Sequence, residues 1–300
     1  MLTAELEQLG WSAFFQQQLS LQEYEDFAAV RVVQQYRDHL VVAGDAGETD
    51  LPVHHKMPPL TVGDWLLVDD VGRYERLLER KSLFSRKAAG SRVQEQLIAA
   101  NVDTAFLVCS LNQDFNLNRI ERYLALVNEA GAEPVVVLTK SDLVDDPASL
   151  RAQVQALDPM LMVEMLNATA ADEVAPLKAW CKAGTTAVFL GSSGVGKSTL
   201  SNALLGKELQ STGGIREDDG KGRHTTTSRS LLRMPAGGLL LDTPGMRNCS
   251  WLTLKRGWRQ PSPTLWCSPR TADSQTASTS LSRAALCWPP WKRENWTSAA

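Results

Sequence analysis

The chain has 300 residues, which is long enough for about two domains, each with its own core. A hydrophobic content of 43%, a charged content of 22% and a net charge of −3 are ordinary for a globular protein. No apolar run approaches the ~20 residues of a membrane span, and the N-terminus does not resemble a signal peptide. The five cysteines have no paired spacing. We therefore expect a reduced, cytoplasmic protein without a membrane partner.

The first part of the chain predicts a short helical segment and then a small β-barrel. Residues 6–21 have a helical pattern in which Trp11, Phe14 and Phe15 can pack. β-forming residues then cluster in 30–42, 51–53 and 64–71, with glycine and proline between the clusters. This spacing is typical of a small barrel, and we expect an OB-type β-barrel in a first domain of residues 1–95. Such barrels often bind nucleic acid, although a barrel that only contacts proteins is the alternative.

A strongly basic run, residues 73–92, follows the barrel. It contains seven Lys and Arg residues, against only Glu75 and Glu79. A solvated surface and a contact with a phosphate backbone are both open interpretations.

From Val102 onwards, strand-like and helix-like segments alternate. The predicted strands are residues 104–110, 134–138, 160–166 and 187–190, and the predicted helices are residues 118–130, 150–157, 173–181 and 198–205. This alternation predicts an α/β fold with a parallel sheet, helices on both faces and ligands at the carboxyl ends of the strands.

A phosphate-binding loop follows the strand 187–190. The segment 191–198 reads Gly-Ser-Ser-Gly-Val-Gly-Lys-Ser and fits G-x-x-x-x-G-K-[ST]. Small residues let backbone N–H groups surround a phosphate chain, Lys197 can reach the β- and γ-phosphates, and the Ser198 hydroxyl can bind Mg²⁺. The alternative is a plain Gly/Ser turn. The predicted phosphate contacts are Gly191, Ser192, Ser193, Gly194, Val195, Gly196, Lys197, Ser198, Thr199 and Gly245.

A guanine-recognition element follows the strand 134–138. Thr139, Lys140, Ser141 and Asp142 match [NT]-K-x-D. The Asp142 carboxylate can accept hydrogen bonds from guanine, whereas adenine would leave it unpaired. The alternative is a helix cap formed by Ser141 or Asp142.

Two further segments resemble nucleotide switches. Asp242-Thr243-Pro244-Gly245 follows the apolar run 239–241, so that Asp242 can hold Mg²⁺ through water and the Gly245 N–H can meet the γ-phosphate. Residues 220–227, Gly-Lys-Gly-Arg-His-Thr-Thr-Thr, suit a loop that supplies a threonine hydroxyl to Mg²⁺.

The guanine element precedes the phosphate-binding loop, which is a circular permutation of the usual GTPase order. A barrel followed by a permuted domain with T-K-S-D, G-S-S-G-V-G-K-S-T, G-R-H-T-T-T and D-T-P-G resembles the ribosome-small-subunit-dependent GTPase A family. The resemblance implies a Mg²⁺-dependent GTPase, with a P-loop GTPase domain in residues 96–247. It also implies a role in late maturation of the small ribosomal subunit, whose rRNA the barrel binds and which stimulates hydrolysis.

The resemblance also implies roles for individual residues. Thr226 is the expected switch ligand of Mg²⁺, beside Ser198 and Asp242. Because Met246 cannot orient water, His224 is the expected catalytic residue. Asn167 and Ala168 fall where the family has its second guanine loop. We expect a monomer; a P-loop kinase for a small molecule, and a nucleotide-dependent binding module with little turnover, are the alternatives.

The resemblance stops in the tail, residues 248–300, which we expect to be irregular. The family continues with a zinc domain carrying C-x₄-C-x-H-x₅-C, whereas this tail has no histidine and three cysteines at other spacings. Codons permitted for the tail can spell the zinc motif when read one base out of register. We therefore predict a frameshift near Arg247, real or from sequencing, and no zinc site in this chain.

Overall fold

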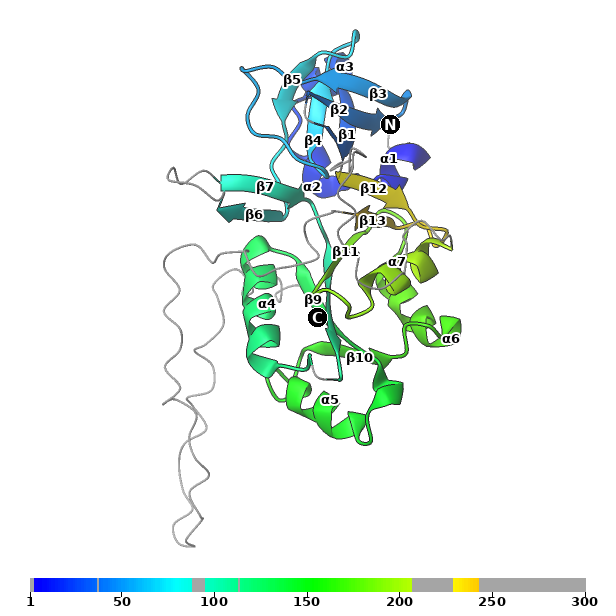
Figure 1. The fold of residues 1–300 in the computed structure, drawn as a ribbon. Coiled ribbons are helices and arrows are strands. Elements are labelled where there is room, and N and C mark those ends of the chain that lie inside the picture. The colour runs from blue at the N-terminus through cyan, green and yellow to red at the C-terminus, as the bar shows by residue number, and fades with distance from the viewer. Residues whose placement is uncertain (1–2, 37, 88–94, 113, 207–228, 243–300) are drawn as a thin grey trace, which may run out of the picture. The chain divides into compact units, whose positions relative to one another are not determined.

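The computed structural model describes residues 3–36, 38–87, 95–112, 114–206 and 229–242 (Figure 1). Within these ranges, no helix is both long enough and apolar enough to span a membrane. The predicted tail and its frameshift lie outside the described residues, as do His224, Thr226 and Gly245.

The N-terminal segment forms three short helices, α1 (Ala4–Gln8), α2 (Ala13–Gln16) and α3 (Leu21–Asp26), where the sequence predicted one helical segment over 6–21. Gly10 interrupts the helix with a φ of 91°, and its place against the Gly184 carbonyl leaves no room for a Cβ. Ser20 then begins α3 with a capping box to Glu23. Trp11 and Phe15 are buried, as predicted, and pack against Trp65 with ring centroids 4.9 and 5.6 Å away.

The sequence predicted an OB-type β-barrel in residues 1–95, and the structure confirms a β-rich N-terminal region. Its antiparallel strands are β1 (Ala28–Gln35), β2 (His39–Gly44), β3 (Gly47–Pro52), β4 (Trp65–Val68) and β5 (Tyr74–Leu77). β1 pairs with β4 through residues 28–31 and with β2 through residues 31–35, and the pairing with β2 shifts register between Val32 and Gln34.

A buried arginine joins the N-terminal segments. Arg31 is only 1% exposed, and its guanidinium donates to the carbonyls of Leu9 (2.5 Å), Asn101 (3.0 Å) and Gly63 (3.3 Å). Burial lowers the pKa of Arg31 to about 10. The Arg31 side chain thus connects the N-terminal helical segment, the β-rich region and the start of the α/β part.

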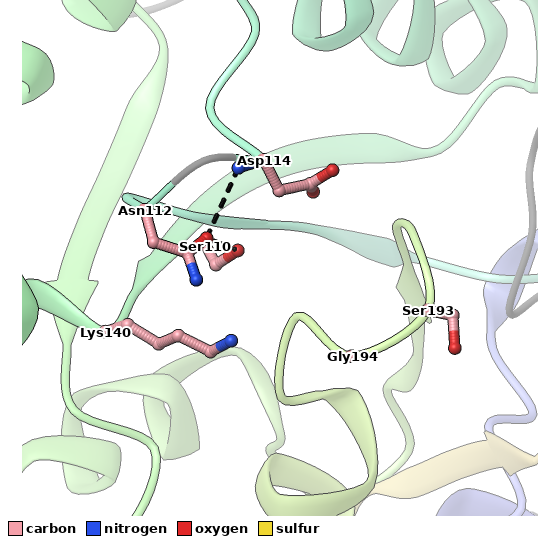
Figure 2. Close-up of a pocket in the computed structure, with 6 residues that line it drawn as sticks. All are labelled: Ser110, Asn112, Asp114, Lys140, Ser193 and Gly194. Atoms are coloured by element: carbon pink, nitrogen blue, oxygen red, sulfur yellow. Dashed lines mark hydrogen bonds between the residues drawn. The ribbon is translucent and has the colours of Figure 1, made fainter. Parts of the chain in front are cut away.

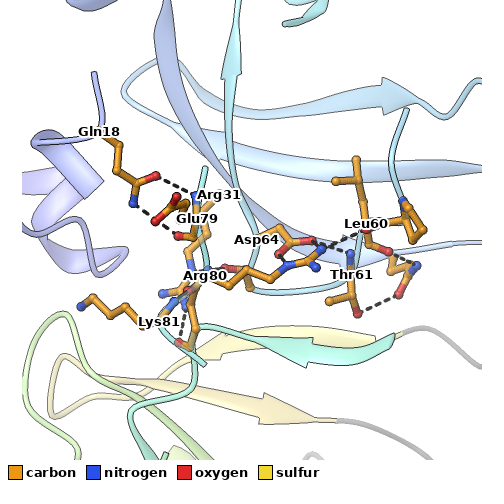
Figure 3. A network of polar contacts seen from close by, with 12 residues as sticks. Gln18, Arg31, Leu60, Thr61, Asp64, Glu79, Arg80 and Lys81 are labelled. Atoms are coloured by element: carbon orange, nitrogen blue, oxygen red, sulfur yellow. Dashed lines mark hydrogen bonds and ion pairs between the residues drawn. The ribbon is translucent and has the colours of Figure 1, made fainter. Parts of the chain in front are cut away.

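The basic side chains of residues 73–81 form contacts within the protein. Arg73 pairs with Asp69 (2.9 Å), Arg76 pairs with Glu23 (2.5 Å), and Arg80 pairs with the buried Asp64 (2.7 Å; Figure 3). Lys81 lies over the Phe15 ring, 5.1 Å from its centroid. These contacts favour a structural role for residues 73–81 over the alternative of a phosphate-backbone contact. The run continues into a hairpin of β6 (Leu83–Lys87) and β7 (Glu95–Ala100) that the sequence did not predict.

The α/β part follows the predicted alternation. Its strands are β8 (Thr104–Ser110), β9 (Glu133–Thr139), β10 (Met162–Leu166), β11 (Thr186–Leu190) and β13 (Leu239–Asp242). Its helices are α4 (Leu117–Ala130), α5 (Pro147–Gln155), α6 (Ala171–Val174) and α7 (Lys197–Leu205), with 3₁₀ turns at Ser141–Leu143 and Ala175–Trp180. The strands are parallel in the order β10-β9-β8-β11-β13, which confirms the predicted parallel sheet.

Each face of this sheet has its own apolar core. Leu107 of β8 belongs to a cluster with Ile120 of α4, whereas the adjacent Phe106 belongs to a second cluster with Leu200 of α7. Neighbouring residues of a strand point to opposite faces, so the continuous apolar run of β8 fits a strand that is covered on both sides. Helices therefore lie on both faces, as predicted (Figure 1).

Strand β12 (Arg229–Arg233), which the sequence did not predict, pairs on both of its edges. It is antiparallel to β13, with Leu231 opposite Leu241, and antiparallel to β1, with Arg229 opposite Gln35. The parallel sheet and the β-rich region are consequently joined by backbone hydrogen bonds into one sheet.

Candidate nucleotide-binding site

The segment 191–196 forms the predicted loop between β11 and α7. Gly191, Gly194 and Gly196 have φ angles of 149°, 76° and 104°, which other residues rarely adopt. A Cβ on Gly191 would lie 2.3 Å from the Val108 carbonyl oxygen, so the loop can cross β8 this closely only with glycine at this position.

Lys197 and the start of α7 face this loop. The Lys197 Nζ donates to the Gly191 carbonyl at 2.9 Å and to the Ser192 carbonyl, so the ammonium lies over the loop. α7 begins at Lys197, and the backbone N–H groups of its first turn carry the partial positive charge of a helix N-terminus. Both features suit a bound phosphate chain.

The guanine element contacts the phosphate-binding loop. Thr139 is buried at the end of β9, and its Oγ1 donates to the Val195 carbonyl at 2.7 Å. Lys140 adopts a left-handed conformation with a φ of 60°. It is also the residue that precedes the 3₁₀ turn at Ser141–Leu143, in which no side chain forms a cap. The alternative interpretation of Ser141 or Asp142 as a helix cap is therefore wrong.

The second predicted guanine loop, which contains Asn167 and Ala168, also lies close to the phosphate-binding loop. A Cβ built on Gly196 would lie 3.6 Å from the Ala168 Cβ and 3.8 Å from the Thr139 Cγ2. Asn167 shapes its own loop, because its Oδ1 accepts from the Thr169 N–H (3.0 Å) and hydroxyl (2.7 Å). Three segments that are far apart in the sequence thus converge around Gly196.

Two of the three residues predicted to bind Mg²⁺ are described. Ser198 lies in the first turn of α7, and Asp242 ends β13, the parallel neighbour of β11. Hydroxyl and carboxylate oxygens fit Mg²⁺, which usually keeps waters and takes its other ligands from phosphate. Among the described residues, no three His, Cys, Asp or Glu side chains are grouped so that they could bind a metal. A magnesium site that uses a single carboxylate is compatible with this finding.

A pocket of about 300 Å³ lies between the phosphate-binding loop and the guanine element (Figure 2). It is lined by Ser110, Asn112, Asp114, Lys140, Ser193 and Gly194. Lys140, Ser193 and Gly194 are predicted site residues, whereas Ser110, Asn112 and Asp114 were not predicted from the sequence. Ser110 ends β8, and Asn112 and Asp114 follow it, so their place at the carboxyl end of a parallel strand is the signal that could have identified them.

The loop after β8 is organised by side chains. The Ser110 hydroxyl donates to Asn112 Oδ1 at 2.8 Å, and the same oxygen accepts from the Asp114 N–H at 3.3 Å (Figure 2). The Asp114 carboxylate pairs with Arg119 and holds the pKa of that guanidinium above its usual value. Arg119 also donates to the Ser192 hydroxyl at 2.7 Å, which links this loop to the phosphate-binding loop.

The chain is similar to several known proteins. The sequence model of the RsgA GTPase family matches residues 77–252. Small ribosomal subunit biogenesis GTPase RsgA 2 of Vibrio parahaemolyticus is 59% identical over 252 residues, which cover 84% of this chain and 70% of the relative. Small ribosomal subunit biogenesis GTPase RsgA of Mesorhizobium japonicum is 47% identical over 248 residues, covering 81% and 71%.

Two solved structures are also similar. The crystal structure of YjeQ from Thermotoga maritima aligns with a TM-score of 0.55 and 27% identity, over 73% of this chain and 75% of that one. The structure of YloQ, described as a circularly permuted GTPase, aligns with a TM-score of 0.54 and 21% identity, over 78% and 76%. The second likeness concerns the fold alone.

Proposed function

We propose that this chain, which belongs to the RsgA GTPase family and is therefore a GTP hydrolase, acts in the late maturation of the small ribosomal subunit. Its relatives, which are named small ribosomal subunit biogenesis GTPases, support this role. The observation that carries the assignment to GTP is the 2.7 Å hydrogen bond from Thr139 to the Val195 carbonyl. It brings a guanine-type recognition element against a phosphate-binding loop, as a single nucleotide site requires.

Two groups of residues would bind GTP, one the phosphates and the other the guanine base. The loop 191–199 holds the phosphates through backbone N–H groups and Lys197, whose ammonium already lies over the loop. Asp142 accepts hydrogen bonds from the guanine edge, with the Lys140 stem against the ring and the Asn167–Ala168 loop beside it. Asp142 is exposed, so its carboxylate is accessible to a base.

Ser198 and Asp242 would hold Mg²⁺, with Thr226 as a third ligand. Magnesium, when bound, neutralises charge between the β- and γ-phosphates. His224 orients or deprotonates the attacking water, a task that the side chain of Met246 cannot perform, and the Gly245 N–H meets the γ-phosphate. These last roles rest on sequence, because His224, Thr226, Gly245 and Met246 lie outside the described residues.

The β-rich region would contact rRNA of the small subunit. One corner of it supports this role: Tyr36 is 37% exposed and stacks on His39, with ring centroids 4.5 Å apart and planes 13° apart. Exposed aromatic rings of this kind can stack with unpaired bases. Asp38 and Asp50 lie beside His39, at 2.8 and 4.0 Å, so the corner suits a base better than a phosphate. The protein would act as a cytoplasmic monomer.

The decisive experiment is a nucleotide hydrolysis assay with and without purified small ribosomal subunits. We expect slow hydrolysis of GTP, stimulation by the subunits, and negligible hydrolysis of ATP, with Lys197→Ala as the inactive control. Equal hydrolysis of ATP would refute the role of Asp142. Retention on subunits with a non-hydrolysable GTP analogue, without stimulated hydrolysis, would favour a binding module, and phosphate transfer to a small acceptor would favour a kinase.

The tail 248–300 needs a separate test. We propose that its reading frame changes near Arg247, because the family's zinc ligands are absent at the family's spacing. Resequencing the gene across codons 245–250 decides the matter, since nucleotides that exclude the shifted reading would refute the proposal. Under this proposal the chain binds no zinc, and zinc analysis of the purified protein should find none.

A further inference from the structure

We propose that Arg119 is a positioning residue of the phosphate-binding loop, held by Asp114 and acting through the side chain of Ser192. The inference deepens the proposed function, because it assumes that the loop 191–199 binds nucleotide. Arg119 lies outside every motif that the sequence analysis recognised, and it reaches the loop from α4, 73 residues earlier in the chain.

The place of Arg119 in its helix points to a role beyond helix stability. Asn116 caps α4, and Arg119 lies in the first turn, where a cation opposes the helix dipole. The Asp114 carboxylate compensates this charge through a contact with Nη1. Both side chains are about one-third exposed, at 34% and 30%, so water screens the pair and its contribution to stability is small. What the pair does achieve is a fixed orientation of the guanidinium.

The fixed guanidinium holds one residue of the loop. Its Nη1 donates to the Ser192 hydroxyl at 2.7 Å, while the carbonyl of Ser192 accepts from the Lys197 ammonium. Ser192 therefore connects Arg119 to the lysine that the proposed function places on the β- and γ-phosphates. A chain of contacts runs from the loop after β8, through Asp114, Arg119 and Ser192, to Lys197.

The same arrangement affects the charge of the pocket. Asp114 lines the pocket beside Ser193 and Gly194, and an unpaired carboxylate there would repel a phosphate chain (Figure 2). Arg119 neutralises this carboxylate. Loss of Arg119 should consequently weaken binding in two ways, by releasing Ser192 and by exposing the negative charge of Asp114.

The test compares Arg119→Ala, Ser192→Ala and the double variant with wild type in the full chain. The dissociation constants of fluorescent GDP and GTP analogues, the turnover number and the melting temperature are measured for each. We expect Arg119→Ala to weaken GDP and GTP by a similar factor, roughly tenfold for the loss of a charged hydrogen bond, with little change in turnover. The double variant should be no weaker than Arg119→Ala alone, because both changes interrupt one chain of contacts.

Two further variants separate positioning from general damage. Arg119→Lys keeps a cation that can reach one partner and should restore part of the affinity. Arg151→Ala removes an exposed arginine from α5 and should leave affinity unchanged. If Arg119→Ala fails to fold, Ser192→Ala alone still tests the chain of contacts, since it should weaken both nucleotides without lowering the melting temperature.

Three results would overturn the inference. Wild-type affinity in Arg119→Ala would remove any role in binding. Multiplicative effects of Arg119→Ala and Ser192→Ala would show that they act independently. A fall in turnover alone would make Arg119 a catalytic residue that contacts the reacting phosphate instead of a positioning residue. If wild-type protein bound no GTP, the proposed function itself would be refuted.

Discussion

The backbone of the phosphate-binding loop allows a matched pair of substitutions, Gly191→Ala and Gly194→Ala. Both glycines have positive φ angles, 149° and 76°. At Gly194 a new Cβ would find nothing within 4 Å, so only the backbone penalty applies, about 1 kcal/mol. At Gly191 the Cβ would lie 2.3 Å from the Val108 carbonyl oxygen. Backbone atoms cannot rotate away, so a packing penalty of about 1–3 kcal/mol is added to a backbone penalty of similar size.

These free energies translate into different melting temperatures. At about 2–4 °C per kcal/mol for a chain of this size, Gly194→Ala should melt about 2–4 °C below wild type, and Gly191→Ala, with at least about 2 kcal/mol lost, at least about 4 °C below it. Circular dichroism melts of the three proteins, without nucleotide, measure the difference. If Gly191→Ala melted within 1 °C of Gly194→Ala, the close approach to β8 would not limit the residue at this position.

Three further predictions concern recognition, turnover and pH. Asp142→Asn should lower the preference for GTP over ATP by at least tenfold in competition binding, and an unchanged preference would contradict guanine recognition by this carboxylate. His224→Ala should keep the affinity for GTP but reduce subunit-stimulated turnover by about 10²–10⁴-fold, and full turnover in a single-turnover assay would remove His224 from the mechanism. Hydrogen bonds from Arg76 and then Ser20 lower the pKa of Glu23 from 4.5 to about 2, so its contribution to stability is complete above pH 4.5 and is lost as the pH falls to about 2. The melting-temperature gap between wild type and Glu23→Gln should therefore narrow from pH 6 to pH 3, and a gap that stays constant would show that this carboxylate is not stabilised.

Local signals predicted the parts of the fold that depend on few residues. The apolar run of β8 was predicted at 104–110, the bounds that the structure gives, because it is buried on both faces and ends in polar residues. The loop between β11 and α7 was also predicted, because its glycines and Lys197 interact with atoms that are close by in the sequence. The place of Thr139 and Lys140 at the end of a strand was predictable because the apolar run 134–138 directly precedes them.

The missed elements depend on partners that are distant in the sequence. β12, Arg-Ser-Leu-Leu-Arg, is too short and too polar to be recognised alone, and it is a strand because β1 and β13 flank it. The contact of Arg119 with the loop was not predicted for a similar reason: no motif contains Arg119, and its partner Ser192 belongs to another strand–helix connection. The single helix predicted over 6–21 was interrupted at Gly10, where a Cβ would lie 2.8 Å from both the Gly184 carbonyl oxygen and Arg31 Nη1.

The double pairing of β12 has a practical consequence for protein engineering. The sequence suggests a cut near residue 95 that would release the GTPase domain, 96–247, as an independent fragment. That cut would remove β1 and convert β12 into an exposed edge strand, a feature that promotes aggregation through pairing with other chains. It would also strip the Arg229 guanidinium of its Gln35 partner while leaving the Leu97 carbonyl in place. Expression and nucleotide binding are therefore best pursued with the β-rich region attached, and a fragment without it should elute as aggregate in size-exclusion chromatography.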